Sequence, residues 1–530
     1  MFIREKTSPT TKNTYLQIVK SYRKGGKVRQ RVVASLGNIS KLRDSNELRK
    51  IALALLDYCS DRPAVVDSSA KEIRRVIWGP VLCYAKLWKR VGMDRILKKI
   101  AQGHQRLQMD LEKAAFLMVV QHLTRPMSKL GTWNSREKLW GEYEIGLQHL
   151  YRTLDIIADS KERIEWELFS INRNLFNNSI DVVFWDTTTL YFDSQKEGGY
   201  RRFGFSKDGK ARDVQVVLGL LVDKEGRPLG FEVFRGDTFD GHTLSEALGA
   251  LKSRFNIDRV IIVADRAMFS RANIEQIRQL GYEYIISARI RNLSGSIKQQ
   301  ITDTRRYKKL EDSEDGQLLV YETGYKGDRL ICTWSSKRAQ KDAWERQMAL
   351  RKIQQKIASG AYSFITNNRY KRYLRFEDGK AVIIDQDKVQ EDCRWDGFYA
   401  IVTNAKKLPA QKILFQYHNL WKVDESFRVM KSHLEARPMF HWTDKRIKGH
   451  LVLCFIAFLL LRELQLILRK KNKNFSAEKI REALTGLQVS ELKIQGRYFL
   501  LRSPVGSVCN DILRALSIKI PPSIQEGKLP

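Results

Sequence analysis

Apolar and polar residues alternate in two short runs near the start of the chain. Thr14–Tyr22 is rich in Tyr, Leu, Ile and Val, and apolar and polar residues alternate across Val28–Leu36. Gly25 and Gly26 lie between the two runs, and glycine pairs favour the tight turns that join antiparallel strands. The pattern predicts a β-hairpin within a first segment that covers residues 1–45.

Apolar residues then recur at helical spacing over residues 46–176, for example in Ala114–Val120. This pattern predicts a helical domain. The longest apolar run of the chain, Leu451–Leu461, has eleven residues, whereas a membrane-spanning helix needs about 20. We therefore expect a buried core helix within a group of helices at 411–470, followed by a helical tail at 471–530.

Residues 177–289 show a different pattern, in which three strand-like runs joined by short turns are followed by helix, strand, helix and strand. The runs are Asp181–Phe192, Asp213–Asp223, Pro228–Phe234, Thr243–Phe255, Arg259–Asp265, Arg271–Leu280 and Tyr284–Ala288. This order resembles the ribonuclease H-like fold, an α/β fold whose mixed sheet carries helices on both faces. Residues 290–410 are polar and turn-rich with short apolar runs, which predicts a β-rich insertion into that fold.

The charge of the chain narrows the choice of partner. There are 94 Lys and Arg residues against 60 Asp and Glu, a formal net charge of +34. Such an excess favours a polyanion, because every neutralised phosphate releases counterions, and it argues against a small neutral molecule as the sole partner. We expect the predicted hairpin and the helical domain to contact DNA. The basic residues proposed for the hairpin are Lys24, Lys27, Arg29 and Arg31.

Cysteine and histidine spacing excludes a zinc centre of the usual kinds. The six cysteines form no CxxC pair, and the eight histidines show no HxH or HxxxH pattern. Six cysteines in 530 residues are also too few for a disulfide framework.

Two aspartates end predicted strands. Asp186 follows the apolar run Val182–Trp185, and Asp265 follows Val260–Ala264. A carboxylate is costly to bury, so it is expected at the rim of a sheet, where ligands bind. In the expected topology the two strands are neighbours, and two converging carboxylates need an opposing charge such as a divalent metal ion. Each aspartate taken alone is equally consistent with a structural role at a strand end.

Four stretches resemble the DDE transposases of the insertion-sequence four superfamily. They are Phe184–Phe192, Ile262–Ser270, Trp395–Asn404 and Tyr417–Lys431, the last running on into Glu435–Trp442. The family marks its last helix by Tyr, two residues, Arg, three residues, Glu, six residues and Lys.

This chain departs from that family pattern at two positions. Tyr417 and Lys431 are in register, but Leu420 stands at the Arg position and Asp424 at the Glu position, with Glu425 next to it. The resemblance implies that the third carboxylate is Asp424 or Glu425. Asp424 keeps the register, while Glu425 has the expected side chain but is rotated about 100° around the helix.

The resemblance also implies the roles of the basic and aromatic residues. Tyr417, Arg428 and Lys431 would hold the terminal phosphate and flanking nucleotide of a transposon end, with Arg266 as a further DNA contact. An aromatic residue of the insertion can stack on a flipped base in this family, and the candidates are Trp334, Trp344 and Trp395.

The function expected from the resemblance is metal-dependent cleavage of transposon ends followed by strand transfer to target DNA. Asp186, Asp265 and Asp424 would bind two Mg²⁺ (or Mn²⁺) ions. The protein would act as a homodimer on double-stranded DNA in the prokaryotic cytosol, without a membrane or a small-molecule substrate. Two alternatives stay open: a structure-selective nuclease with the same core, and a catalytically impaired DNA-binding protein derived from a transposase.

Overall fold

The computed structural model describes residues 1–44, 47–48, 50–52, 71–104, 107–176, 182–210, 212–255, 260–265, 270–310, 318–359, 371–377 and 380–530. It divides into two compact units. One comprises Met1–Lys71 with Lys493–Gly496, and the other comprises Glu72–Leu492 with Arg497–Pro530.

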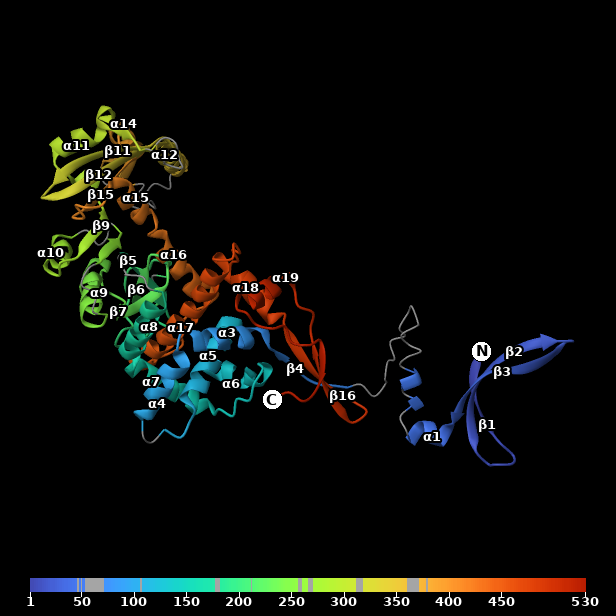
Figure 1. The fold of residues 1–530 in the computed structure, drawn as a ribbon. Helices are drawn as coiled ribbons and strands as arrows, with labels where there is room; N and C mark the ends of the chain where they lie inside the picture. The colour runs from blue at the N-terminus through green and yellow to red at the C-terminus, as the bar shows by residue number, and fades with distance from the viewer. Residues whose placement is uncertain are drawn as a thin grey trace. The chain divides into compact units, whose positions relative to one another are not determined.

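The first unit contains a three-stranded antiparallel sheet (Figure 1). Its elements are β1 (Phe2–Thr7), β2 (Thr14–Lys24), β3 (Lys27–Asn38) and the short helix α1 (Ile39–Asp44). Gly25 and Gly26 have φ angles of 60° and 74° and connect Lys24 to its pairing partner Lys27. Two consecutive positive φ angles suit glycine and give a turn whose twist matches that of the strands. The predicted hairpin is confirmed, and β1 adds a strand that the prediction omitted.

The second unit begins within strand β4 (Lys71–Ile77), which is followed by a group of helices. The helices are α3 (Gly79–Arg90), α4 (Met93–Gln102), α5 (Leu111–Thr124), α6 (Lys129–Ser135), α7 (Leu147–Asp159) and α8 (Lys161–Phe176). Helix α17 (Asp444–Arg469) packs against α5 and α7. By length and composition α17 could cross a membrane, but 94% of its most apolar window is buried inside the protein. It is therefore the core helix expected from the apolar run.

A nine-stranded mixed sheet forms the centre of the second unit. Its strands, in chain order, are β5 (Val182–Tyr191), β6 (Gln215–Asp223), β7 (Pro228–Arg235), β8 (Ile261–Ala264), β9 (Glu283–Ser287), β10 (Lys308–Lys309), β11 (Leu318–Tyr325), β12 (Asp328–Ser335) and β15 (Phe398–Thr403). In space the order is β10-β11-β12-β15-β9-β8-β5-β6-β7. Strands β5, β6 and β7 are antiparallel, whereas β5, β8 and β9 are parallel.

Helices cover both faces of this sheet. Because side chains alternate along each strand, neighbouring residues pack against helices on opposite faces. Phe184 of β5 packs in one core cluster with Phe455 of α17. Its neighbour Trp185 packs in the other cluster with Leu244 of α9 (Asp240–Ser253) and Ile277 of α10 (Arg271–Gln279). The chain is thus a mixed α/β protein with helices on both faces, as expected.

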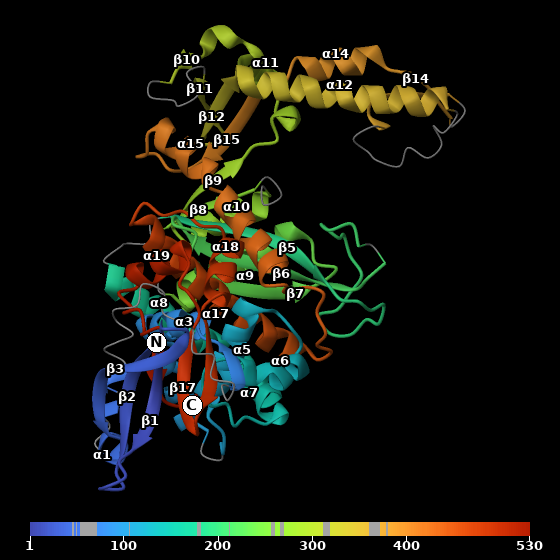
Figure 2. The same cartoon turned by 90° about the vertical axis from the view of Figure 1, so that its right-hand side faces the viewer.

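The region 290–410 is less separate than the prediction suggested. Strands β11, β12 and β15 extend the central sheet instead of forming a sheet of their own, because β15 pairs with β9. The region also holds a long helix, α12 (Ser336–Ala358), which lies beside α14 (Gln386–Cys393) and the hairpin of β13 (Leu374–Glu377) and β14 (Lys380–Ile384) (Figure 2).

The prediction of a wholly helical C-terminus is wrong. Besides α18 (Ala477–Thr485) and α19 (Ser507–Ala515), this region contains β16 (Gln488–Ile494), β17 (Arg497–Arg502) and β18 (Ile524–Glu526), which join β4 in a four-stranded sheet. Gln495 and Gly496 have φ angles of 49° and 80° at the β16–β17 turn. Two consecutive positive φ angles also occur at the Gly25–Gly26 turn, but a single glycine gave a weaker sequence signal here.

The expected continuous helix Tyr417–Lys431 is also interrupted. The structure has α15 (Ala410–His418), α16 (Trp421–Arg428) and a π-helical turn at Val429–His433. At the break, the Asn419 side chain donates a hydrogen bond to the Phe415 carbonyl over 3.0 Å. A π-helical turn places more residues in one turn than an α-helix does. Lys431 is therefore not aligned with Asp424 as it would be on one continuous α-helix.

Candidate active site

Asp186 and Asp265 lie at adjacent positions of two neighbouring parallel strands. Asp265 directly follows β8, whereas Asp186 lies within β5 and pairs with Leu220 of β6. The prediction that Asp186 ends its strand is therefore wrong, because the polar run Thr187–Thr189 continues the pairing with β6. Trp185 of β5 is the register partner of Ala264 of β8, and each aspartate is the next residue along its chain. Asp186 is half-buried, whereas Asp265 is exposed. The indole of Trp185 lies so close to Gly219 of β6 that an added Cβ there would meet it at 2.2 Å, which fixes the strand directly before Asp186.

Asp424 approaches the same place from a helix. Helix α16 packs against β5 and β6, and the negative charge of Asp424 acts on Asp186 while that of Asp265 acts on both. The structure therefore brings three carboxylates, from two strands and one helix, into one electrostatic cluster.

The environment of Asp186 penalises its charged form. Its pKa is raised to about 7, mainly by burial and also by the charges of Asp424 and Asp265, against the opposing effects of Lys207 and the Thr187 backbone N–H. That N–H donates to Asp186 Oδ1 over 2.7 Å. The pKa of Asp424 is also raised, first by burial and then by Asp265. A cluster of this kind favours a bound proton or cation.

The cluster fits a divalent cation in its donor chemistry. Carboxylate oxygens are the ligands that Mg²⁺ and Mn²⁺ prefer. Such an ion would also neutralise the negative charges that repel one another in the cluster. Among the residues that the structure describes, however, no three His, Cys, Asp or Glu side chains are gathered closely enough to hold a metal ion. Binding an ion here thus requires the carboxylates to approach one another further.

Glu425, the other candidate for the third carboxylate, is engaged elsewhere. Its Oε2 accepts a hydrogen bond over 3.2 Å from Arg462 of α17, whose side chain is 1% exposed. Of the two residues, Asp424 is therefore the one whose carboxylate interacts electrostatically with Asp186 and Asp265.

Lys207 is a site residue that the sequence analysis missed. It lies in the loop between β5 and β6, where its Nζ donates to the Thr187 carbonyl over 2.7 Å and pairs with Asp240 Oδ2 at 2.9 Å. Its positive charge lowers the pKa of both Asp186 and Asp424. A lysine in a loop without apolar periodicity gives no sequence signal for this position.

The residues expected to bind DNA fall in several places. Lys431 forms an ion pair with Asp208 at 3.1 Å, and Arg428 is exposed on α16. The side chains of Lys24, Lys27, Arg29 and Arg31 are exposed on the hairpin of the first unit. Arg266 lies outside the described residues.

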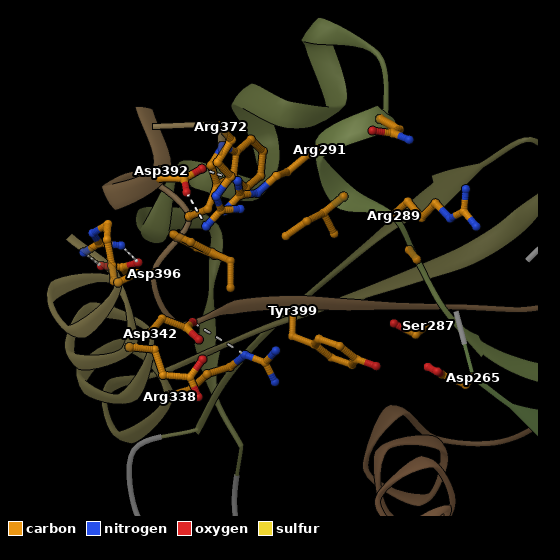
Figure 3. Close-up of a pocket in the computed structure, with 18 of the residues that line it drawn as sticks. Asp265, Ser287, Arg289, Arg291, Arg338, Asp342, Arg372, Asp392, Asp396 and Tyr399 are labelled. Carbon is orange, nitrogen blue, oxygen red and sulfur yellow. Dashed lines mark hydrogen bonds and ion pairs between the residues drawn. The ribbon is translucent and has the colours of Figure 1, made fainter. Parts of the chain in front are cut away.

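Tyr417 contacts Tyr399, which together with Asp265 lines a pocket of about 690 Å³. Its ring contacts that of Tyr399 with centroids 5.6 Å apart, and the Arg338 guanidinium lies 4.6 Å from the centre of the Tyr399 ring. Figure 3 shows Asp265, Ser287 and Tyr399 at one end of the pocket and Arg291, Arg372 and Asp392 at the other. Its lining arginines are Arg289, Arg291, Arg338, Arg346 and Arg372.

The three tryptophans proposed for base stacking differ in position. Trp395 lines this pocket, whereas Trp344 is 61% exposed on α12. Trp334 donates its ring N–H to the Asp396 carbonyl over 3.1 Å. Of the three, Trp395 is thus the one placed to face a ligand in the pocket.

Comparisons with known proteins identify the family of the chain. Residues 3–66 match the model of the IS1634 family transposase, N-terminal domain, and residues 177–460 match that of the transposase DDE domain. Comparison with curated proteins gave no match.

Similar solved structures include a Mos1 transposase paired-end complex with left transposon end and a pre-cleavage Mos1 transpososome. The first is 12% identical with a TM-score of 0.15, the second 13% identical with a TM-score of 0.15. Each match covers 34% of this chain, and 59% and 60% of the respective Mos1 chains. The match to the DDE domain spans more than half of the sequence, and the match to the IS1634 N-terminal domain is confined to residues 3–66. The chain therefore belongs to the DDE transposases.

Proposed function

We propose that this protein cuts DNA at the ends of a mobile element and joins the freed ends to target DNA, at a site formed by Asp186, Asp265 and Asp424. The observation that supports the proposal is the mutual electrostatic influence of these carboxylates, on β5, directly after β8 and on α16, in a chain of net charge +34. The strand order, three antiparallel strands followed by two parallel ones, supports a ribonuclease H-like core.

The family generally uses divalent metal ions, and we propose Mg²⁺ or Mn²⁺, with two ions in the active complex, held by the same three aspartates. When bound, such ions activate water as a nucleophile and stabilise the charge that develops on the phosphate. Because Asp186 has a pKa of about 7, its carboxyl is partly protonated at neutral pH in the metal-free protein. It must lose that proton to act as a ligand.

The surrounding residues would hold the DNA. Arginine forms paired hydrogen bonds with phosphate and lysine provides a point charge, so Arg428 and Lys431 are suited to the strand beside Asp424. The pocket beside Asp265 has Trp395 in its wall, together with arginines and the acidic residues that pair with several of them, and an unstacked nucleotide would bind there by stacking on Trp395. The basic hairpin of the first unit would contact the duplex of the element end.

We propose double-stranded DNA as the partner and a homodimer that pairs two element ends, acting in the prokaryotic cytosol, without a membrane or a small-molecule substrate. The test uses DNA from the two edges of the region around the encoding gene, with Mg²⁺ and a labelled target. Joined products support the transposase. Cutting without joining would favour a structure-selective nuclease, and binding without cutting a DNA-binding protein that has lost activity.

A further inference from the structure

Two adjacent residues of the β5–β6 loop contact opposite sides of the proposed site. Lys207 points to Thr187 and Asp240 and exerts its charge on Asp186 and Asp424. Asp208, the next residue, contacts the basic side chains that follow α16. The loop therefore places a positive charge at the carboxylates and a negative charge at the cations.

Asp208 is held by two basic side chains at once. Its two carboxylate oxygens each lie 3.1 Å from Lys431 Nζ, and the same side chain forms an ion pair with Arg437. The contact is largely enclosed, since the side chains of Lys431 and Asp208 are 10% and 17% exposed. Enclosure reduces screening by salt, so this pair is worth more than a surface ion pair.

A carboxylate on a lysine and an arginine presents the same chemistry as a phosphate group. Both are anions whose oxygens accept charge-assisted hydrogen bonds from these two side chains. A DNA phosphate would therefore compete with Asp208 for Lys431 and Arg437. Lys207 is likewise a cation beside carboxylates that must come closer together to hold a metal ion.

We propose that Lys207 and Asp208 form an autoinhibitory contact, the 207–208 latch, in which Asp208 occupies the place of a DNA phosphate on Lys431 and Arg437. DNA binding displaces Asp208, and the movement of the loop takes Lys207 away from the carboxylates. The inference rests on the proposed function, which assigns Lys431 to DNA, and it adds Arg437 to that contact. It follows that the protein with the latch in place binds DNA more weakly than it would if Lys431 and Arg437 were not paired with Asp208.

The test compares Asp208→Asn with Asp193→Asn in the full chain. Both substitutions remove one negative charge from the same loop, but Asp193 is exposed and is not part of the latch, so it controls for net charge. Binding to a labelled duplex is followed by fluorescence anisotropy at several salt concentrations. We expect Asp208→Asn to lower Kd about three- to thirtyfold at moderate salt, the range for freeing an enclosed ion pair, and Asp193→Asn to change it less than twofold.

A second arm locates the effect at the basic pair. In a Lys431→Ala/Arg437→Ala background the added Asp208→Asn substitution should no longer tighten binding, since the cations that Asp208 blocks are gone. Equal affinities for Asp208→Asn and Asp193→Asn, or an Asp208→Asn effect that persists in that background, would overturn the latch.

A measurement on the unmodified protein covers the case in which Asp208→Asn fails to fold. The Lys207 backbone N–H donates to Thr189 Oγ1 over 3.1 Å, and displacement of the loop breaks that bond. Hydrogen exchange of amides 206–210 should become faster when duplex is added, and unchanged or slower exchange would overturn the proposal. If Asp208→Asn tightens binding but no DNA is cut, the latch stands and the proposed function fails. If DNA ends are cut and joined but Asp208→Asn does not change the affinity, the proposed function stands and the latch fails.

Discussion

Glu425 and Arg462 form an ion pair at 3.2 Å between α16 and the buried core helix α17. Glu425 thus faces Arg462, whereas Asp424, the next acidic residue of α16, acts electrostatically on Asp186. The two adjacent carboxylates therefore have separate tasks, one in the stability of the helix packing and one at the candidate active site. A substitution of Glu425 should mainly lower the stability of the fold, whereas a substitution of Asp424 should mainly lower the rate of DNA cleavage.

Glu425→Gln should destabilise the protein while most of the activity per folded molecule remains. Arg462 is 1% exposed, and a buried guanidinium that loses its carboxylate partner is expected to cost about 1–3 kcal/mol of unfolding free energy. Denaturant unfolding measures this loss. A variant as stable as the parent but unable to cut DNA would assign Glu425 to catalysis and contradict our placement.

Asp424→Asn should abolish cleavage while leaving DNA binding intact. The substitution keeps the size of the side chain but removes a charge, and loss of a ligand in a two-metal site is expected to cost several kcal/mol of transition-state stabilisation, a rate loss of about a thousandfold or more. Single-turnover cleavage of an element-end duplex gives the rate, and anisotropy gives the affinity. Asp193→Asn, with the same change in charge, is the matched control and should cut normally.

Asp186 should make the metal-free protein less stable as pH rises. Its pKa is raised from 3.8 to about 7 in the folded state, so between these values the native state binds more protons than the unfolded state, and stability falls with increasing pH. Asp186→Asn removes this dependence. We expect the variant to gain about 1–3 kcal/mol relative to the parent at pH 8, and little at pH 4.

Thermal unfolding of both proteins in a chelating buffer, at these two pH values, checks this prediction. Addition of Mg²⁺ should restore stability to the parent at pH 8 but not to the variant. An equal difference between the two proteins at both pH values would show that the Asp186 carboxyl titrates normally.

Neutralising the hairpin should reduce the salt dependence of DNA binding. The four basic residues to be replaced by glutamine are Lys24, Lys27, Arg29 and Arg31. If each contacts a phosphate, the slope of log Kd against log salt should decrease by roughly 2–4, since each contact contributes about 0.9. Affinities measured between low and moderate salt give the slope, and an unchanged slope would remove the hairpin from the DNA interface.

The sequence predicted those parts of the fold that depend on local pattern. Apolar alternation and two glycines sufficed for the β2–β3 hairpin, and the apolar runs before Asp186 and Asp265 sufficed for neighbouring strands. The C-terminal sheet was missed because its β16–β17 turn uses Gln495 with Gly496, and because β4, with which it forms a sheet, lies more than 400 residues away in the sequence.

The candidate site was predictable only in part, because some of its residues are brought together by contacts between distant parts of the sequence. Asp186 and Asp265 are each marked by the apolar run before them, but Lys207 and Asp208 lie in a loop without regular pattern. Their roles arise from contacts with Asp240, Lys431 and Arg437, all distant in sequence. The break at Asn419 likewise depends on a side-chain hydrogen bond that residue spacing does not reveal.

Binding of Mn²⁺ to the complex with element-end DNA tests the central claim most directly. Electron paramagnetic resonance counts the bound ions in the parent protein and in the variants Asp186→Asn, Asp265→Asn and Asp424→Asn. We predict bound Mn²⁺ in the parent and in the Asp193→Asn control, and reduced binding in each of the three variants. Undiminished Mn²⁺ binding in all three would contradict the assignment of Asp186, Asp265 and Asp424 as one metal site.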